Sequence, residues 1–282
     1  MRLLWILLVA LAGCTRGGFG VAGQPHDGGA RCGPFTAPRH LAELGSSATE
    51  WAPAISSDEL TIYVESDRSG TSRIWVATRA AVGAPFTAPA LLEGIDGRAS
   101  SPAISADDRE LYFDQGTLYR SVRDRAEAPF APSAALDIVG WPGGNGSGPW
   151  LSADGLSLYY GAGADVSVES HIALATRATL SAPFTVAGTL TELSPSSKNG
   201  WPTLSPDGRE LLFESQVDGS GRIYAAYRQG PGDAFSAPEP LADISGDFEL
   251  GDPELSRDGR TLYYASTATG DWEIWAASRS CP

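Results

Sequence analysis

The residues of this chain that could do chemistry are carboxylates, amides and indoles placed in corresponding segments along the sequence. They are Glu50, Trp51, Arg98, Trp141, Asn145, Lys198, Asn199, Trp201, Asp247, Glu249 and Asp252. Two carboxylates about 5 to 9.5 Å apart can cleave a glycosidic bond, and Glu50, Glu249 and Asp252 are the candidates for that reaction. Indoles beside carboxylates and amides can instead bind a sugar, a peptide or a protein loop. A third interpretation is a solvated rim whose indoles pack between structural elements.

Other catalytic patterns are absent from the sequence. The three histidines, His26, His40 and His171, show no metal-ligand spacing, so neither a metal nor a cofactor is expected. Ser147 lies in a glycine-rich stretch, but Asn145 stands where the nucleophile motif G-x-S-x-G requires glycine. The aspartates of a recurring Ser-x-Asp-Gly sequence fit turns, because aspartate bonds its own backbone there; they are Asp154, Asp207 and Asp258.

A fivefold internal repeat must position the candidate residues. Its copies begin with a proline that is followed three residues later by serine, at Pro53, Pro102, Pro149, Pro202 and Pro253, which are 49, 47, 53 and 51 residues apart. Each copy continues to an arginine, and in four copies a phenylalanine stands seven residues after it. The candidates of the first paragraph lie just before these prolines, which places them at the start of each unit.

Each unit reads as four strands. The second strand carries three consecutive apolar residues, such as Ile62-Tyr63-Val64 and Leu111-Tyr112-Phe113. Adjacent residues of a strand point to opposite faces, so both faces of the strand must be covered. A radial array of sheets covers both faces, which predicts a β-propeller.

Composition agrees with this fold class and excludes one kind of partner. Among 282 residues, 33 glycines and 20 prolines supply the punctuation of many short strands rather than long helices. The net charge of −14 opposes binding to a phosphate backbone, so no nucleic-acid partner is expected.

The five copies resemble the PD40, WD40-like propeller repeat, which is best known from the periplasmic TolB propeller and from bacterial envelope lipoproteins. The resemblance covers residues 31–282. It implies a binding propeller of the cell envelope. Nothing here resembles the N-terminal domain of TolB, so the resemblance does not carry over TolB's specific partners.

The two chain ends are expected to complete one blade together. The fifth copy stops three residues after Arg279, and its missing PFTAP-like strand stands at Pro34–Pro38. We therefore expect an all-β, five-bladed propeller of four-stranded antiparallel blades, closed by the N-terminal strand. Cys32 and Cys281 occupy two positions of one loop, so they should face each other within the Cα separation of roughly 4.4 to 6.8 Å that a disulfide needs. The alternative is two unpaired thiols.

Residues 1–14 read as a lipoprotein export signal. One cation, Arg2, precedes an apolar run that is too short to span a bilayer, and Leu11-Ala12-Gly13-Cys14 follows. Cys14 is the expected lipidation site, and the glycine-rich segment 15–30 is the expected tether. This segment resembles the bacterial lipoprotein signal, and Thr15 after the cysteine resembles its outer-membrane sorting preference. The resemblance implies a protein on the periplasmic or surface face of a bacterial outer membrane.

These observations favour a lipid-anchored, monomeric, non-enzymatic propeller that binds an envelope protein, a peptide or a glycan through its rim. The rim residues of this interpretation are Glu50, Trp51, Arg98, Trp141, Asn145, Asn199, Trp201, Glu249 and Asp252. The enzymatic alternative is a propeller glycoside hydrolase that uses Glu50, Glu249 and Asp252. A third alternative is an architectural spacer without a ligand.

Overall fold

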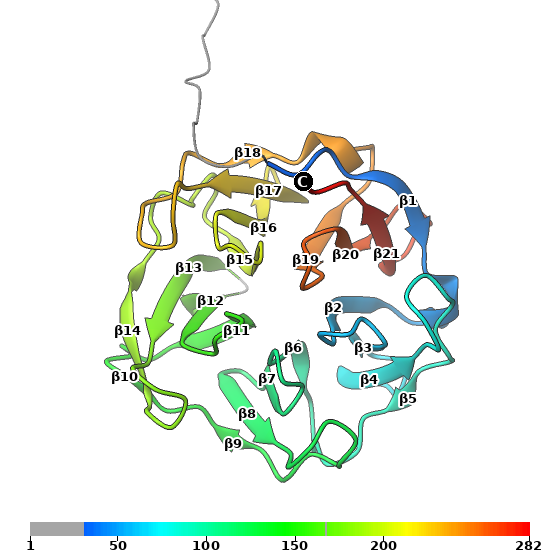
Figure 1. Ribbon diagram of the computed structural model, residues 1–282, viewed down its shortest axis with the longest axis horizontal. Helices are drawn as coiled ribbons and strands as arrows, with labels where there is room; N and C mark the ends of the chain where they lie inside the picture. Colours follow the sequence, from blue (N-terminus) through cyan, green and yellow to red (C-terminus); the bar gives the residue numbers. More distant parts are fainter. Residues whose placement is uncertain (1–30, 167) are drawn as a thin grey trace, which may run out of the picture.

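The computed structural model describes residues 31–166 and 168–282, and they form five β-sheets arranged around a central axis (Figure 1). The expected five-bladed propeller is therefore confirmed. The expected leader, residues 1–14 with Cys14, and the expected tether, residues 15–30, lie outside the described residues. In the described ranges the only helical segments are the 3₁₀ turns η1 (Ala42–Leu44) and η2 (Ala242–Ile244), and no helix there is long and apolar enough to cross a membrane.

Each sheet is one blade, and the first strand of each of the five repeat copies lies nearest the central axis (Figure 1). Blade 1 contains β2 (Glu50–Ile55), β3 (Thr61–Ser66), β4 (Arg73–Thr78) and β5 (Ala90–Leu91). Blade 2 contains β6 (Ser100–Ile104), β7 (Glu110–Asp114), β8 (Leu118–Val122) and β9 (Ala134–Ala135). Blade 3 contains β11 (Asn145–Leu151), β12 (Ser157–Asp165), β13 (Glu169–Thr176) and β14 (Phe184–Thr189), with β10 (Ile138–Val139) added parallel to β14 as a fifth strand.

The last two blades complete the ring. Blade 4 contains β15 (Asn199–Leu204), β16 (Glu210–Val217), β17 (Ser220–Tyr227) and β18 (Glu239–Pro240). Blade 5 contains β19 (Leu250–Leu255), β20 (Thr261–Ser266) and β21 (Glu273–Ser278), and its outermost strand is β1 (Thr36–His40) from the other end of the chain. The closure by the N-terminal strand is thus as expected.

The second strand of each blade is buried on both faces. Tyr63 and Tyr112 are 1% and 0% exposed, and the apolar residues on either side of each, which point to the opposite face of the strand, are buried as well. The cause is that five hydrophobic clusters lie between neighbouring blades rather than within one sheet; the cluster with Tyr63, for example, also contains Phe113 of the next blade. Burial on both faces is what the three consecutive apolar residues predict.

The recurring Ser-x-Asp sequence forms a turn between the first and second strands of every blade. In each copy the serine hydroxyl donates to the aspartate, over 2.6 to 2.7 Å, as in the pairs Ser152–Asp154, Ser205–Asp207 and Ser256–Asp258. The aspartate then accepts a backbone N–H two residues later. Turn chemistry therefore accounts for these aspartates, as expected.

The repeated arginine joins each blade to the blade before it. Arg79 lies over the ring of Phe86 at 4.6 Å, donates from Nε to the carbonyl of Glu59 and donates from Nη2 to the hydroxyl of Tyr263 in blade 5. The same stacking recurs in every blade, at 4.3 to 4.6 Å. In blade 5 its partners come from opposite chain ends, since Arg279 lies over Phe35.

A disulfide locks this closure. β1 pairs antiparallel with β21, and Cys32 is bonded to Cys281 across 249 residues of chain, with a Cα–Cα distance of 4.2 Å. The expected pairing is confirmed, with the two Cα atoms slightly closer than the expected range. The bond therefore links the segment before β1 covalently to the segment after β21, two strands of one blade that no loop connects.

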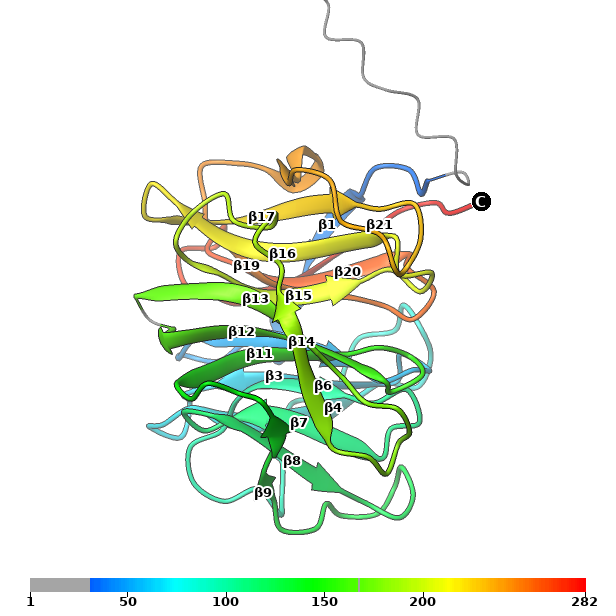
Figure 2. The same cartoon turned by 90° about the vertical axis from the view of Figure 1, so that its left-hand side faces the viewer.

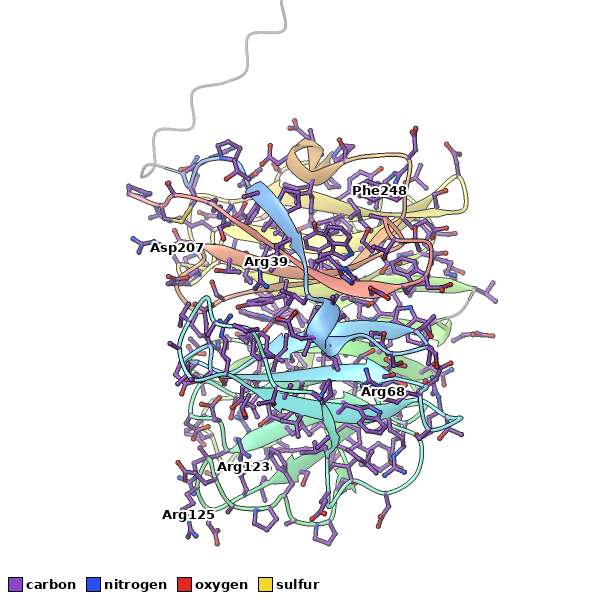
Figure 3. The ribbon with its side chains drawn as sticks, turned by 90° about the vertical axis from the view of Figure 1, so that its right-hand side faces the viewer. Arg39, Arg68, Arg123, Arg125, Asp207 and Phe248 are labelled. Carbon is purple, nitrogen blue, oxygen red and sulfur yellow. A yellow bond between two sulfur atoms is a disulfide. The ribbon has the colours of Figure 1, made fainter. Side chains whose placement is uncertain are left out.

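The propeller has two distinct faces, seen edge-on in Figures 2 and 3. In Figure 3, Arg68 and Phe248 lie toward one face, and Arg125 and Asp207 lie toward the other. We call the first the mouth face, because the innermost strands begin there, and the second the turn face, because it carries the Ser-x-Asp turns.

Breaking the disulfide should destabilise the ring. In the double variant Cys32→Ser/Cys281→Ser, the unfolded chain is no longer constrained by a loop of this length, so we expect a loss of about 4 kcal/mol of unfolding free energy. Thermal unfolding followed by circular dichroism would measure it. The oxidised wild type should lose as much on reduction, while the double variant should not respond to reductant. Equal melting temperatures for the two proteins would show that the strand pairing closes the ring without the bond.

Candidate functional site

Every innermost strand bulges at the residue before its proline. The pairing of each first strand with its second is interrupted there, as between Trp51 and Ala54 in blade 1. The bulged residues adopt positive φ angles; they are Ala52 (46°), Ser101 (51°), Gly148 (52°), Trp201 (49°) and Asp252 (49°). A bulge re-aims a side chain and frees a backbone N–H, and here both changes occur five times around one axis.

Three of these freed N–H groups bind carboxylates. The N–H of Ser101 donates to Glu65 Oε2 over 3.0 Å, and the N–H of Asp252 donates to Glu214 Oε2 over 3.3 Å. In both cases the carboxylate belongs to the preceding blade. The N–H of Ala52 donates to Asp252 Oδ2 over 3.2 Å. The bulges therefore hold buried carboxylates close to the axis.

Trp201 closes the channel below these carboxylates. Its indole extends from blade 4 past Gly148 of blade 3, and its Nε1 donates to Ser101 Oγ of blade 2 over 3.1 Å. A Cβ at Gly148 would lie 2.8 Å from the indole, so glycine is what leaves room for it. Trp201 borders the narrow channel of about 20 Å³ on one side and a much larger cavity on the other.

The larger space, which we call the mouth cavity, has a volume of about 660 Å³. Six of the described carboxyl groups line it: Glu65, Asp114, Asp165, Glu214, Glu249 and Asp252. Two cations, Arg98 and Lys198, and three indoles, Trp51, Trp201 and Trp272, line it as well. A concave site with convergent polar groups and aromatic walls is typical of small-molecule binding.

Glu214 and Asp252 form a coupled acidic pair. Burial, with a smaller contribution from the nearby Glu249, raises the pKa of Glu214 to about 7 against the opposing effects of its hydrogen bonds and of Lys198. Burial also raises the pKa of Asp252 well above its ordinary value, and the charge of Glu214 adds to this. Two adjacent buried carboxyl groups cannot both ionise easily, so the pair retains a proton near neutral pH.

Glu65 and Asp114 form a second pair, on blades 1 and 2. Burial raises the pKa of Asp114 to about 6, and the charge of Glu65 contributes. Arg98 lies 3.9 Å from Asp114 and opposes the shift. Between about pH 6 and pH 7 the site can therefore present an ionised Asp114 and a protonated Glu214. Such a combination supplies a general base and a general acid.

Several of the residues expected at the rim meet in the mouth cavity. They are Trp51, Arg98, Asn145, Lys198, Trp201, Glu249 and Asp252. Asp247, which precedes Phe248 on the loop to β19, does not line this cavity.

Glu50, Trp141 and Asn199 lie elsewhere. Glu50 is fully buried, and its Oε1 accepts hydrogen bonds from Ser46, Ser66 and Arg68. Asn199, at the equivalent position of blade 4, is bonded to Ser215, and its side chain is also buried. Trp141 stacks on Tyr160 with ring centroids 5.0 Å apart. These side chains support the blades, so the carboxylate set Glu50, Glu249 and Asp252 does not assemble.

Glu65, Asp114 and Glu214 are site residues that the sequence reasoning missed. Each directly follows the three apolar residues of a second strand, where the other two copies have Gly161 and Ala265. An acidic residue follows the three apolar residues of the second strand in three of the five copies. This pattern could have predicted the site, because that end of the strand must lie near the central axis.

A second large cavity lies at the closure. It has a volume of about 620 Å³ and is bordered by Arg31, Phe35, Tyr227 and Arg279. Two of its cations already have partners: Arg279 is paired with Glu210, and Arg31 lies over the Tyr227 ring at 3.9 Å. This cavity accompanies the closing contacts, and the convergent carboxylates belong to the mouth cavity.

Comparison with known proteins shows similarity in fold. No protein-family model matches the chain, and no curated protein matches it in sequence. The catalytic domain of a Coprinopsis cinerea GH62 α-L-arabinofuranosidase matches with a TM-score of 0.57 and 12% identity, over 91% of this chain and 98% of that one. An α-L-arabinofuranosidase from Podospora anserina matches with a TM-score of 0.55 and 13% identity, over 88% and 96%. A putative TolB from Agrobacterium tumefaciens matches with a TM-score of 0.47 and 16% identity, over 81% and 76%.

These comparisons correct the expected function. The sequence favoured a non-enzymatic, TolB-like binding module, and that expectation is contradicted. The solved structures that match with TM-scores above 0.5 include glycoside hydrolases and a gluconolactonase, whereas the TolB likeness lies below that value. The enzymatic alternative fits better, although with a different carboxylate set. At 12 to 13% identity the likeness shows the fold alone, so the chemistry must be argued from the residues of the mouth cavity.

Two buried carboxylates of the inner blade strands should affect stability in opposite directions. Folding raises the pKa of Glu214 to about 7, so the folded protein holds this proton more tightly than the unfolded chain does. The resulting contribution to the free energy of unfolding is fully present at pH values below the ordinary glutamate pKa and is lost as pH rises through about 7. Glu214→Gln cannot ionise, so at about pH 8 it should be more stable than wild type by on the order of 2 kcal/mol, and about equal to it at pH 4. Glu50→Gln should instead be less stable than wild type at about pH 8, because Arg68 loses its charged partner.

Urea unfolding at the two pH values would measure both variants. If Glu214→Gln were less stable than wild type at the higher pH, Glu214 would have to be an ion-paired structural residue rather than a strained acid.

Proposed function

We propose that this protein is a glycoside hydrolase whose active site is the mouth cavity. The observation that carries the proposal is the convergence of two carboxyl pairs from four blades onto one closed-bottomed cavity, with pKa values of about 6 for Asp114 and about 7 for Glu214. Hydrolysis of a glycosidic bond needs one carboxylic acid and one carboxylate on either side of the bond. The likeness in fold to glycoside hydrolases supports the same conclusion.

Glu214 would act as the general acid and Asp114 as the general base. Glu214 donates its proton to the glycosidic oxygen while the bond from that oxygen to the anomeric carbon breaks. Asp114 accepts a proton from a water molecule, whose oxygen forms the new bond to the anomeric carbon. The two residues lie on blades 4 and 2, which are separated by blade 3, so they reach the substrate from different sides. The backbone N–H of Asp252 donates to Glu214 Oε2 and would hold this carboxyl group in place.

The indoles would bind and orient the sugar. Trp201 forms the floor between the two carboxyl pairs, and Trp51 and Trp272 stand at the wall. Aromatic faces stack on the apolar faces of sugar rings and leave the hydroxyl groups to polar neighbours.

A location at a cell envelope is part of the same proposal. The five repeat copies support membership of the PD40 repeat family, and Leu11–Cys14 supports lipid attachment at Cys14. Labelling of expressed protein with radioactive palmitate tests the anchor: the label should be absent from Cys14→Ser, and equal labelling of both proteins would contradict the assignment.

Turnover of glycosides tests the proposed reaction. Wild type should release sugar from members of a panel of aryl glycosides and oligosaccharides, and Glu214→Gln and Asp114→Asn should each lose about 10²- to 10⁴-fold in kcat. Glu254→Gln is the matched control. Burial raises the pKa of Glu254 to about 7 as well, but this residue lies in the narrow channel beyond Trp201, so its variant should keep full activity. Wild type without turnover on any glycoside would overturn the proposal.

The pH dependence of kcat/KM tests the two roles separately. Activity should rise as pH increases through about 6, where Asp114 ionises, and fall as pH increases through about 7, where Glu214 loses its proton. Asp114→Asn should remove the acidic limb from the residual activity, and Glu214→Gln should remove the alkaline limb. A profile that rises monotonically with pH would contradict the acid role of Glu214.

A further inference from the structure

The lining of the mouth cavity has an excess of negative charge. Six carboxyl groups of the described chain face only two cations there. One of the cations, Arg98, is 60% exposed at the edge and already lies 3.9 Å from Asp114. The other, Lys198, acts on Glu214. The carboxyl groups outnumber these cations, so a bound cation would relieve the repulsion among them.

The indoles of the same cavity favour the same sign of charge. The face of an indole carries negative potential and attracts an ammonium group more strongly than other aromatic rings do. Trp51, Trp201 and Trp272 are only partly buried and line the wall and floor. This observation is independent of the carboxylates, and it also points to a positively charged ligand.

Ser147 adds an incomplete hydrogen-bonding group. It is only 6% exposed and borders the mouth cavity, and its hydroxyl has no partner among the described residues. A buried hydroxyl without a partner is costly, and a ligand rich in hydroxyl and amino groups can satisfy it.

We propose that the mouth cavity selects saccharides that carry a protonated amine, such as units of glucosamine, over neutral and uronic-acid saccharides. The turnover of such sugars rests on the proposed function, but the selectivity of binding does not. A volume of about 660 Å³, closed below by Trp201, suits a short saccharide. The carboxylates would repel a uronic acid, and an N-acetylated sugar would lack the charge.

Binding of an ammonium group should be coupled to proton release. The raised pKa values of Glu214 and Asp114 mean that these groups hold protons in the free protein near pH 6. A nearby ammonium group favours the ionised carboxylates, so affinity should rise between about pH 5 and pH 7. The affinity for a neutral saccharide should change little over the same range.

The test is a set of binding titrations followed by tryptophan fluorescence, with the glucosamine disaccharide, its N-acetylated counterpart and a galacturonic acid disaccharide as probes. At about pH 7 the amino disaccharide should bind at least about tenfold more tightly than the N-acetylated one, with the uronic acid weakest. Glu249→Gln, which removes a wall charge, should weaken the amino disaccharide about fivefold and leave the N-acetylated one unchanged. Glu254→Gln, beyond the Trp201 floor, should change neither affinity.

Each outcome decides between the two proposals. Equal affinities for the amino and N-acetylated probes, or no saturable binding of any saccharide, would overturn the selectivity. A basic peptide that bound in place of all three saccharides would also overturn it. Selective binding of the amino probe without turnover of any glycoside would leave the selectivity standing and remove the proposed function. Turnover of glycosides without a preference for the amino probe would support the proposed function and overturn the selectivity.

Discussion

The contact that holds this propeller together is made by an arginine that belongs to one blade and reaches the blade before it. Each guanidinium lies over a phenylalanine of its own blade and donates to a carbonyl of the turn between the first two strands. All five also pair with a tyrosine hydroxyl or a glutamate carboxylate of the preceding blade, as Arg79 does with Tyr263 and Arg177 with Glu110. Arg123 and Arg228 repeat the pattern, so the same contact recurs from blade to blade around the axis. A ring of regular sectors can close only if its last sector is complete. Strand β1 completes that sector and places Phe35 against Arg279.

Closure of the ring is what creates the site. Five equivalent bulges then face one axis. Residues that differ between the repeat copies therefore lie on different sides of a single cavity. Where the copies carry Glu65, Asp114, Glu214 and Asp252, the ring gathers acids in a place shielded from water. A Cβ at Gly251 would lie 2.5 Å from Glu214 Oε2, so a glycine permits the close approach of that carboxylate. Grouping these buried acids lowers the free energy of unfolding at neutral pH. This cost is common in functional sites that keep a carboxyl group protonated near pH 7.

The repeat made the fold predictable from the sequence, whereas the site was only partly predictable. Three adjacent apolar residues such as Ile62, Tyr63 and Val64 require cover on both faces, and the short fifth copy with its missing strand at Pro34–Pro38 requires closure. Several of the rim candidates line one cavity, but the direction of their side chains was not accessible from the sequence. Glu50 and Asp252 both lie near the start of an innermost strand, two positions apart in the repeat. Only the bulge turns Asp252 to the axis, while Glu50 points into a network with Arg68. A bulge common to all copies leaves no irregularity in the spacing of the repeat, so spacing cannot reveal it.

The most direct test of this account is the protonation of Glu214 itself. Carbon-13 NMR of side-chain carboxyl groups, with the Glu214 resonance assigned by its loss in Glu214→Gln, reports the titration of this residue without any substrate. The account predicts an apparent pKa of about 7, because burial and the neighbouring carboxylates oppose its ionisation. A titration near the ordinary glutamate value of about 4.3 would show that the group is solvated, and an acid role at the mouth of the channel would then be untenable.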